Sequence, residues 1–165
     1  MNREITPQEL QQEAIAFRAD CSSVILATSA PDGMPDAGYA PCILDDQLRC
    51  HVLISRLAQH TKNLLAHPVA SLMWIETTDM AKNPFARRRL VMRCGAVALD
   101  RGSDDRESLI DMMQSTHGNT VPLLAKLDDF ILFRFEALDG NYVRGFAQAW
   151  AVEGNALSVR ERRKR

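Results

Sequence analysis

The sequence of 165 residues lacks several features that would assign a function at once. Its four cysteines form no C-x-x-C pair, which removes the basis for a zinc knuckle or a thioredoxin-like motif. No segment approaches a membrane span, and the first residues have no apolar signal region. The formal net charge is only −1, so no overall field attracts nucleic acid or an acidic membrane. We therefore predict a cytoplasmic, reduced protein with neither nucleic-acid nor membrane partners.

The chain also lacks internal repeats and the Gly-x-Ser-x-Gly elbow of a serine hydrolase. Hydrophobic residues make up 46% of it, a globular composition, and the length allows one domain with a real core. We predict a single domain over residues 1–157. Basic residues crowd the remaining segment, 158–165, which we expect to be a solvated, disordered tail.

Short β-rich segments dominate the pattern. Residues 23–29, 37–44 and 48–55 alternate with turn signals and predict an antiparallel meander. Further strands are expected at 69–76, 90–99, 130–135 and 142–152. Helices are expected after the capping box at Thr6–Glu9, after Ser55 as far as Ala66, and from Asp104 to Gly118. These elements predict a mostly β (α+β) fold, a small antiparallel barrel with peripheral helices.

The segment from Ile54 to Leu64 carries the clearest functional signal. It ends a strand and opens a helix, and it places hydroxyl, imidazole, ammonium and amide groups where helix amides lack partners. Such a helix start favours anions, so a phosphate-bearing small molecule is the first ligand to test.

A run of arginines precedes the strand at 90–99. Successive strand residues point to opposite faces, so Arg87 and Arg89 share one side and Arg88 the other. We predict that Arg87 and Arg89 face a phosphate or a propionate and that Arg88 faces solvent.

Six short blocks then occur in a characteristic order: Tyr39-Ala40-Pro41; Ile54-Ser55-x-Leu57-Ala58-x-His60-x-x-Asn63-Leu64; Pro68-x-Ala70-Ser71-Leu72; Phe85-Ala86-Arg87-x-Arg89-Leu90; Phe130-x-Leu132-Phe133; and Gly145-Phe146-x-Gln148-Ala149. Together they resemble the FMN-binding split-barrel superfamily, which includes pyridoxamine 5'-phosphate oxidase. Within it they look most like the haem-utilisation branch of HugZ/HutZ-type proteins. The resemblance implies a six-stranded antiparallel split barrel that forms a homodimer, with two cofactor sites at the interface.

The resemblance also implies residue roles. His60 lies where the oxidases place a phosphate-binding lysine, Ser55 and Thr61 would flank the same phosphate, and Ile54 and Asn63 belong to the same motif. The other implied cofactor-binding residues come from three places. They belong to the strand that would back the flavin ring (Tyr39, Ala40, Pro41), to a pair of arginines on a neighbouring strand (Arg87, Arg89), and to the last strand, either of the same subunit or of its partner (Gly145, Phe146, Gln148). No catalytic residue or metal ligand is assigned, because the flavin itself carries the redox chemistry.

One departure from the family bears on the cofactor. Haem-degrading members resemble this chain but supply an axial histidine after the last strand. Residues 158–165 of this chain contain no histidine. Asp129 nevertheless matches the aspartate that orients this histidine in the family. We therefore expect an FMN-dependent oxidoreductase acting on a small-molecule substrate or electron acceptor. Two alternatives stay open: a haem-binding or haem-degrading protein, with propionates held by Arg87 and Arg89 and His117 as a spare ligand, and a non-catalytic cofactor-binding protein.

Overall fold

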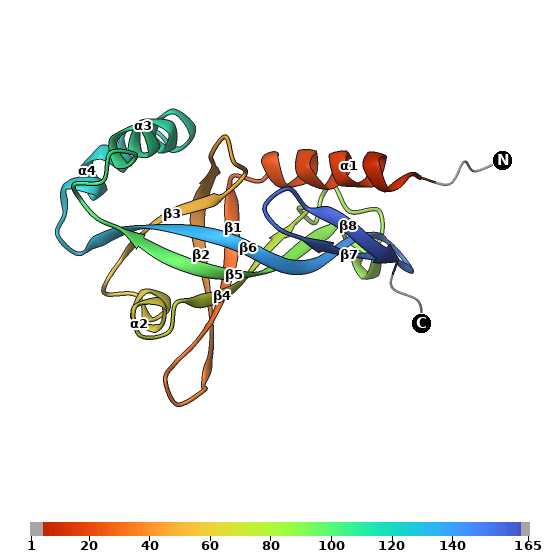
Figure 1. Ribbon diagram of the computed structural model, residues 1–165, viewed down its shortest axis with the longest axis horizontal. Coiled ribbons are helices and arrows are strands. Elements are labelled where there is room, and N and C mark those ends of the chain that lie inside the picture. The colour runs from red at the N-terminus through yellow and green to blue at the C-terminus, as the bar shows by residue number, and fades with distance from the viewer. Residues whose placement is uncertain (1–4, 163–165) are drawn as a thin grey trace.

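The computed structural model describes residues 5–162 and consists of eight strands, four α-helices and one short 3-10 helix, α1 to β8 in chain order (Figure 1). The strands are β1 (Ser23–Ser29), β2 (Pro35–Leu44), β3 (Cys50–Ser55), β4 (Val69–Ile75), β5 (Arg89–Leu99), β6 (Phe130–Gly145), β7 (Gln148–Glu153) and β8 (Ser158–Arg162). The helices are α1 (Pro7–Ala19), α2 (Gln59–Ala66), η1 (Pro84–Ala86), α3 (Arg106–His117) and α4 (Thr120–Lys126).

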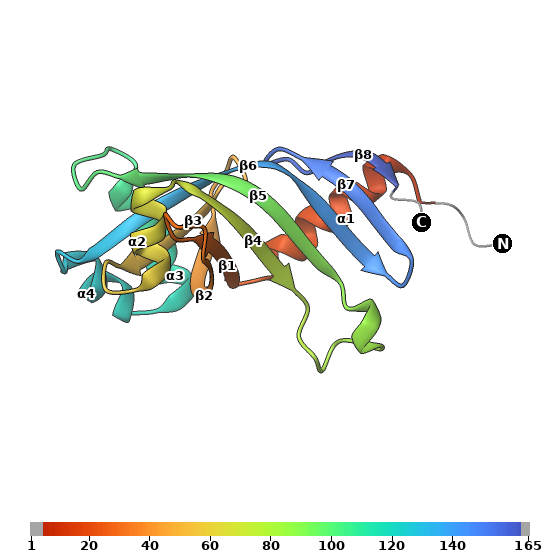
Figure 2. The ribbon, with the colours of Figure 1, turned by 90° about the horizontal axis from the view of Figure 1, so that it is seen from below.

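Six of the strands close into a barrel. The sheet runs β3-β2-β1-β4-β5-β6, and β3 also pairs with β6, from Cys50 opposite Phe135 to Ser55 opposite Phe130. Every pair is antiparallel. β6 is long enough to continue past the barrel, where β7 and β8 extend the sheet (Figure 2). The predicted six-stranded split barrel is thereby confirmed.

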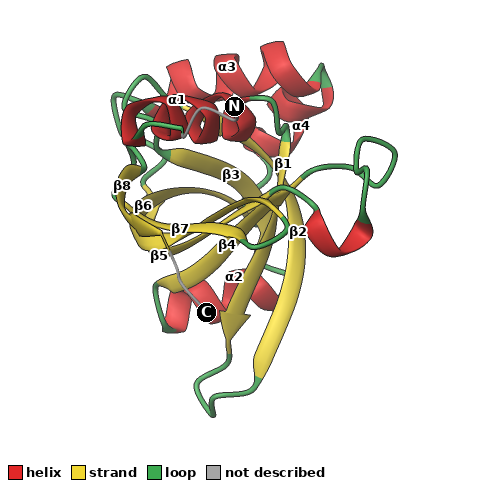
Figure 3. Cartoon of the chain, turned by 90° about the vertical axis from the view of Figure 1, so that its right-hand side faces the viewer, coloured by secondary structure: helices red, strands yellow, loops and turns green. Residues whose placement is uncertain are grey.

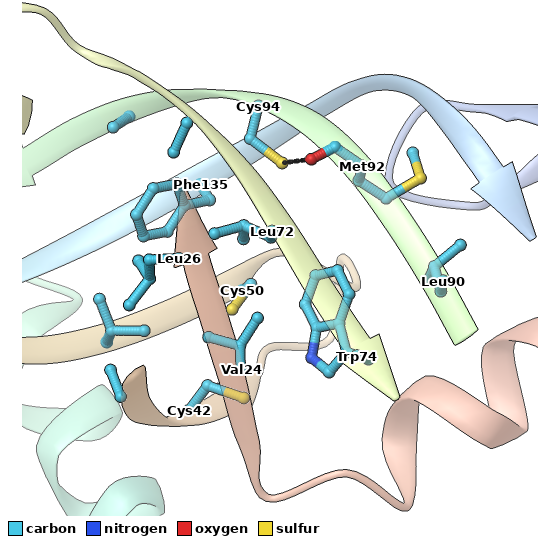
Figure 4. Packing of buried hydrophobic residues seen from close by; sticks show 14 of the residues in the cluster. Val24, Leu26, Cys42, Cys50, Leu72, Trp74, Leu90, Met92, Cys94 and Phe135 are labelled. Carbon is cyan, nitrogen blue, oxygen red and sulfur yellow. Dashed lines mark hydrogen bonds between the residues drawn. The ribbon is translucent and has the colours of Figure 1, made fainter. Parts of the chain in front are cut away.

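The barrel interior is filled by alternate side chains of the strands. Val24 and Leu26 of β1 are buried, as are Leu72 and Trp74 of β4, while their sequence neighbours face outward. This period of two is what an antiparallel strand requires when one face meets the core. Figure 4 shows these side chains gathered between the strands.

The helices lie outside the sheet, with α1, α3 and α4 on one side and α2 on the other (Figure 3). α1 begins at the predicted capping box, where Thr6 Oγ1 accepts from the Glu9 backbone N–H at 3.2 Å. α2 ends at Ala66, as predicted, because Pro68 follows. Within residues 5–162 none of the helices is long and apolar enough to cross a membrane.

Three sequence-based expectations need correction. The strands predicted at 130–135 and 142–152 are divided differently: residues 130–145 form one continuous strand, β6, because the polar stretch in its middle still pairs with β5, and a turn at 146–147 separates β6 from β7. The helix α4 was not expected. The segment 158–162 is not a disordered tail but the strand β8, which pairs with β7 and places Arg162 over the Trp150 ring at 5.6 Å. Residues 163–165 of the predicted tail lie outside the described residues.

Candidate functional site

The end of β3 is fastened to the start of β6 just before α2 begins. Ser55 Oγ donates to Asp129 Oδ2 at 2.5 Å, and the Arg56 backbone N–H donates to the Asp129 carbonyl at 2.7 Å. Ser55 Oγ in turn accepts from the Leu57 backbone N–H at 3.1 Å. Ser55 and Asp129 are therefore adjacent, and the hydroxyl predicted to flank a phosphate is held by a carboxylate.

The first turn of α2 has donors without acceptors. Its N-cap is Ala58, whose side chain cannot cap, and the turn contains no acidic residue. Among the described residues of α2, Lys62 is the first whose backbone N–H donates to a carbonyl of the preceding turn, that of Ala58. The backbone amides of Gln59, His60 and Thr61 therefore precede the hydrogen bonds of the helix. This is the arrangement in which a helix start favours an anionic group.

The His60 imidazole rests against the backbone of β2. A Cβ built on Gly38 would lie 2.5 Å from His60 Nδ1, so the ring occupies space that only glycine leaves free. The ring is half-buried. Burial lowers the pKa of His60 and the charge of Asp36 only partly opposes this, which leaves a neutral imidazole at pH 7.

Two other residues of the α2 motif are interior. Asn63 is 1% exposed, donates to Thr28 Oγ1 at 2.9 Å and accepts from Gln59 Nε2, so its side chain ties α2 to β1. Thr61 is also buried, and its Oγ1 has no partner. The structure thus gives Asn63 a structural contact and leaves Thr61 Oγ1 as an unsatisfied group.

Strand alternation divides the residues predicted to back the cofactor ring. Tyr39 is 64% exposed and points outward from β2 with Pro41, whereas Ala40 is 1% exposed. Ile54 of β3 is likewise in the core. Ala40 and Ile54 therefore offer a ligand no side-chain surface, and Tyr39 and Pro41 are the accessible pair.

The arginine run differs from its prediction. Arg88 does not point freely into solvent: its side chain is 37% exposed, its guanidinium lies 4.7 Å from the centre of the Phe17 ring, and its Nε lies 3.9 Å from Glu76 Oε2. The reason is that Arg87 still belongs to the bend after η1, so strand alternation begins only at Arg89. Arg87 Nε and Nη2 donate to the Glu76 carbonyl, while Arg89 uses only Nη1, which donates to the Arg87 carbonyl.

The residues of the last predicted block lie elsewhere. Gly145 and Gln148 line an open cavity of about 490 Å³ with Arg88 and Arg144, and Phe146 in the adjoining turn is 64% exposed. Ser55 pairs with the first residue of β6 and Gly145 is its last, a strand contour of roughly 50 Å. Figures 1 and 2 show α2 and the β6–β7 turn at opposite ends of the molecule. One chain does not bring the two groups together.

Comparison with known proteins identifies the family of this chain. The sequence model described as pyridoxamine 5'-phosphate oxidase matches residues 10–144, most of the chain. The chain belongs to this family. The match runs from within α1 to residue 144 in β6 and includes α2, and it ends just before Gly145, Phe146 and Gln148.

Within the family, this chain is similar in sequence and structure to HutZ and ChuZ. It is 37% identical over 148 residues to the haem oxygenase HutZ of Vibrio cholerae, covering 90% of this chain and 84% of that protein. A crystal structure of HutZ, described as a haem storage protein, superimposes with a TM-score of 0.77 at 36% identity, covering 83% of this chain and 96% of that one. Campylobacter jejuni ChuZ gives a TM-score of 0.85 at 27% identity, covering 94% of this chain and 63% of its own. The predicted placement near the HugZ/HutZ branch is confirmed.

Sequence reasoning missed Gly38 and misassigned Arg88. A glycine inside a strand signals close approach of another group, and Gly38 follows that rule five residues after a turn glycine. Nothing in the sequence alone identifies His60 as the group that approaches, because the two residues are brought together by the packing of α2 on β2.

Proposed function

We propose that this family member is a haem-binding protein of the haem-utilisation type that works as a homodimer. The observation that carries the proposal is the His60 imidazole, which is neutral, half-buried and without a hydrogen bond in the described chain. A neutral imidazole is a good iron ligand but supplies no charge for a phosphate dianion. HutZ, described both as a haem oxygenase and as a haem storage protein, supports the same ligand.

The other three histidines are less suited to hold iron. His51 is fully buried with Nε2 2.9 Å from Asp45 Oδ2, and His117 Nε2 lies 3.0 Å from the Cys42 carbonyl. His67 is exposed beyond the end of α2. The structure therefore makes His60 a better candidate than His117, the spare ligand considered from the sequence.

Groups that fit the propionates of haem lie in two places: at the start of α2, beside His60, and at Arg89, which pairs with Val143 near the β6–β7 turn and would reach the site from the second copy. The free amides at the start of α2 favour carboxylates. Arg89 has only Nη1 engaged in the described chain, which leaves Nε and Nη2 able to bind a carboxylate. Arg87 is the weaker candidate of the pair, because two of its nitrogens already donate to the Glu76 carbonyl.

The homodimer is supported by the outer face of the barrel. Tyr39, Ile25, Met73 and Val91 lie in register across β2, β1, β4 and β5 and point outward, and the last three remain partly accessible in the single chain. A cavity of about 520 Å³ opens on this face between β1, β4 and β6. A second copy would cover this apolar surface and bring its own β6–β7 turn towards α2.

FMN remains the second candidate, because it is the cofactor implied for the family as a whole and its phosphate would suit the free amides of α2. The expectation of FMN as the principal cofactor has less support than haem, since HutZ, 37% identical to this chain, is described as a haem protein both as a sequence relative and as a solved structure.

A binding titration separates the two ligands. Purified protein is titrated with haemin and, separately, with FMN, following the Soret band and flavin fluorescence. We expect haemin to bind at low micromolar concentration or tighter, and His60→Ala to weaken it at least tenfold with a shifted Soret maximum, while His117→Ala changes neither. Tight FMN binding with no haemin complex would overturn the proposal.

Turnover is a separate question, because the descriptions of HutZ as an oxygenase and as a storage protein differ on whether the ring is opened. Supplying a reductant and oxygen to the haemin complex decides this for the present chain. Loss of the Soret band with release of iron indicates an oxygenase, and an unchanged spectrum indicates a carrier.

A further inference from the structure

The segment that joins β4 to β5 presents a phenylalanine to solvent. Phe85 in η1 is 87% exposed, the highest value for a large hydrophobic side chain among residues 5–162. Exposed apolar side chains are common on soluble proteins, so exposure alone assigns no role. Two further observations set Phe85 apart: the backbone beneath it is anchored, and it lies at the end of the molecule that has to complete the proposed haem site.

The backbone on both sides of Phe85 is held in place. Asn83 Oδ1 accepts from the Phe85 backbone N–H at 2.9 Å, and Pro84 restricts the first position of η1. After η1, Arg87 Nε donates to the Glu76 carbonyl at 3.2 Å, which fastens the segment to the end of β4. The aromatic ring is therefore carried by an ordered turn, and a contact made by it costs little additional ordering.

Phe85 lies far from α2 of its own chain. Asn83 and Ala86, which stand on either side of it in the sequence, line the same cavity as Gly145 and Gln148 at the β6–β7 turn. Figure 2 shows the β4–β5 connection and the β6–β7 turn at one end of the molecule and α2 at the other. Phe85 therefore belongs with the group of residues that one chain does not bring to α2.

A haem bound at α2 needs an apolar contact that the polar groups there do not supply. His60 would coordinate the iron from one face of the porphyrin, and the free amides of α2 would hold propionates at its edge. Small-molecule sites bury most of their ligand and are lined mainly by hydrophobic and aromatic side chains. The porphyrin face opposite the imidazole therefore requires a further group.

We propose that Phe85 of one subunit packs against the porphyrin bound at His60 of the other subunit, so that each haem site is completed across the dimer. This role of Phe85 rests on the proposed haem site and homodimer. A two-fold dimer makes the exchange reciprocal, because each subunit offers one α2 end and one η1 end. Arg89, four residues after Phe85 and opposite Val143 of β6, would reach the site from the same direction.

Phe85→Ala tests the contact in the full-length protein. Haemin titration should show an affinity roughly tenfold lower, with an unchanged Soret maximum because His60 still ligates the iron, and ultracentrifugation should show an unchanged dimer. Leu123→Ala, at a residue of α4 that is 65% exposed, is the control and should bind haemin like the wild type.

Three results would contradict the role of Phe85: wild-type affinity in Phe85→Ala, a shifted Soret maximum, or loss of affinity only together with loss of the dimer. Each of these leaves haem binding by the wild-type chain in place. A wild-type chain that binds no haemin removes the proposed function itself, so the two failures are distinguishable.

Mixed dimers show which subunit supplies Phe85. Chains with His60→Ala and chains with Phe85→Asp, carrying different affinity tags, are produced together, and dimers that hold both tags are isolated. If Phe85 acts across the interface, one site carries both substitutions and the other is intact, so one haemin per dimer should bind with wild-type affinity. If Phe85 acts within its own chain, both sites are damaged and tight binding is absent.

The matched control places the same two substitutions in one chain and pairs that chain with the wild type. Both sites of this dimer are then damaged if Phe85 acts across the interface, whereas one stays intact if it acts within the chain. Tight binding in this second dimer and not in the first overturns the proposal, as does tight binding in both or in neither.

Discussion

Gly38 and Gly140 each leave space that a neighbouring group occupies. Because the neighbour is a side chain at Gly38 and backbone at Gly140, substitution by alanine should have different effects at the two positions. At Gly38 the obstructing group would be the His60 ring, 2.5 Å from an added Cβ, which is a side chain that can move. We expect Gly38→Ala to leave the free energy of unfolding within about 1 kcal/mol of wild type but to displace the imidazole. Haemin affinity should fall as in His60→Ala, whereas Gly95→Ala, with nothing within 4 Å, should leave it unchanged. Unchanged haemin binding in Gly38→Ala would show that the ring position does not matter.

At Gly140 the obstruction is backbone. An added Cβ would lie 2.0 Å from the Val91 carbonyl oxygen and 2.6 Å from Met92 Sδ, where β5 and β6 approach each other past a bulge. We expect Gly140→Ala to destabilise the fold by about 2–4 kcal/mol, since neither strand can withdraw. Urea unfolding measures this loss, with Gly95→Ala as the strand glycine that should tolerate the change. Equal midpoints for the two variants would contradict the packing described here.

Asp45 and His51 make the fold sensitive to acid. Burial alone would raise the pKa of Asp45, but hydrogen bonds from His51 and Arg49 outweigh it and lower that pKa from 3.8 to about 2. Its contribution is therefore present above pH 3.8 and is lost as the pH falls towards 2. Burial also lowers the pKa of His51, so the unfolded chain takes up that proton first and stability already declines below pH 6.5.

We accordingly expect Asp45→Asn to cost about 2 kcal/mol at pH 7, a cost that shrinks as the pH falls to 2. Urea unfolding of both proteins across this range measures it. A difference between variant and wild type that is independent of pH would show that Asp45 acts through packing rather than through its charge.

At the scale of elements, α1 shows how a local signal determines a boundary. Thr6, Pro7 and Glu9 satisfy the first amides of the helix by contacts within four residues. Thr6→Ala should cost about 1 kcal/mol of unfolding free energy. Gln12→Ala, at an exposed position inside the same helix, should be close to neutral, and a comparable loss there would remove the cap as the explanation.

Elements with local signals were the ones that the sequence could predict. Pro68 after α2 and Gly118 after α3 end their helices where expected. The middle of β6 and the strand β8 carry no such signal, because Asp139 and Arg162 are polar residues that become strand through pairing with β5 and β7. The same limit explains Arg88, whose contact with Phe17 depends on where α1 lies against the barrel.

At the scale of the whole molecule, the candidate site could be predicted only in part. The α2 motif was found because its residues are consecutive in the sequence, and the family resemblance supplied the β6–β7 residues. Their spatial relation could not follow from one sequence, since Gly145 lies at the far end of β6 from Ser55 and would meet α2 only in the dimer proposed above.

The proposed dimer yields a prediction at this scale. Val91→Arg places a charge in the centre of the outward apolar row and should convert the dimer to a monomer and weaken haemin binding together. Analytical ultracentrifugation and the Soret titration measure the two effects. Leu123→Arg, at a residue of α4 that is 65% exposed, is the control and should change neither. A Val91→Arg protein that remains dimeric would exclude this face as the interface.

The seam between β3 and β6 has a consequence for biosynthesis. β3 is complete at residue 55, but its second neighbour in the sheet begins only at residue 130. During translation the nascent chain therefore presents a bare strand edge, with unused amides and carbonyls, until about 75 more residues have left the ribosome. Newly made chains should need a chaperone in that interval far more than the finished protein does.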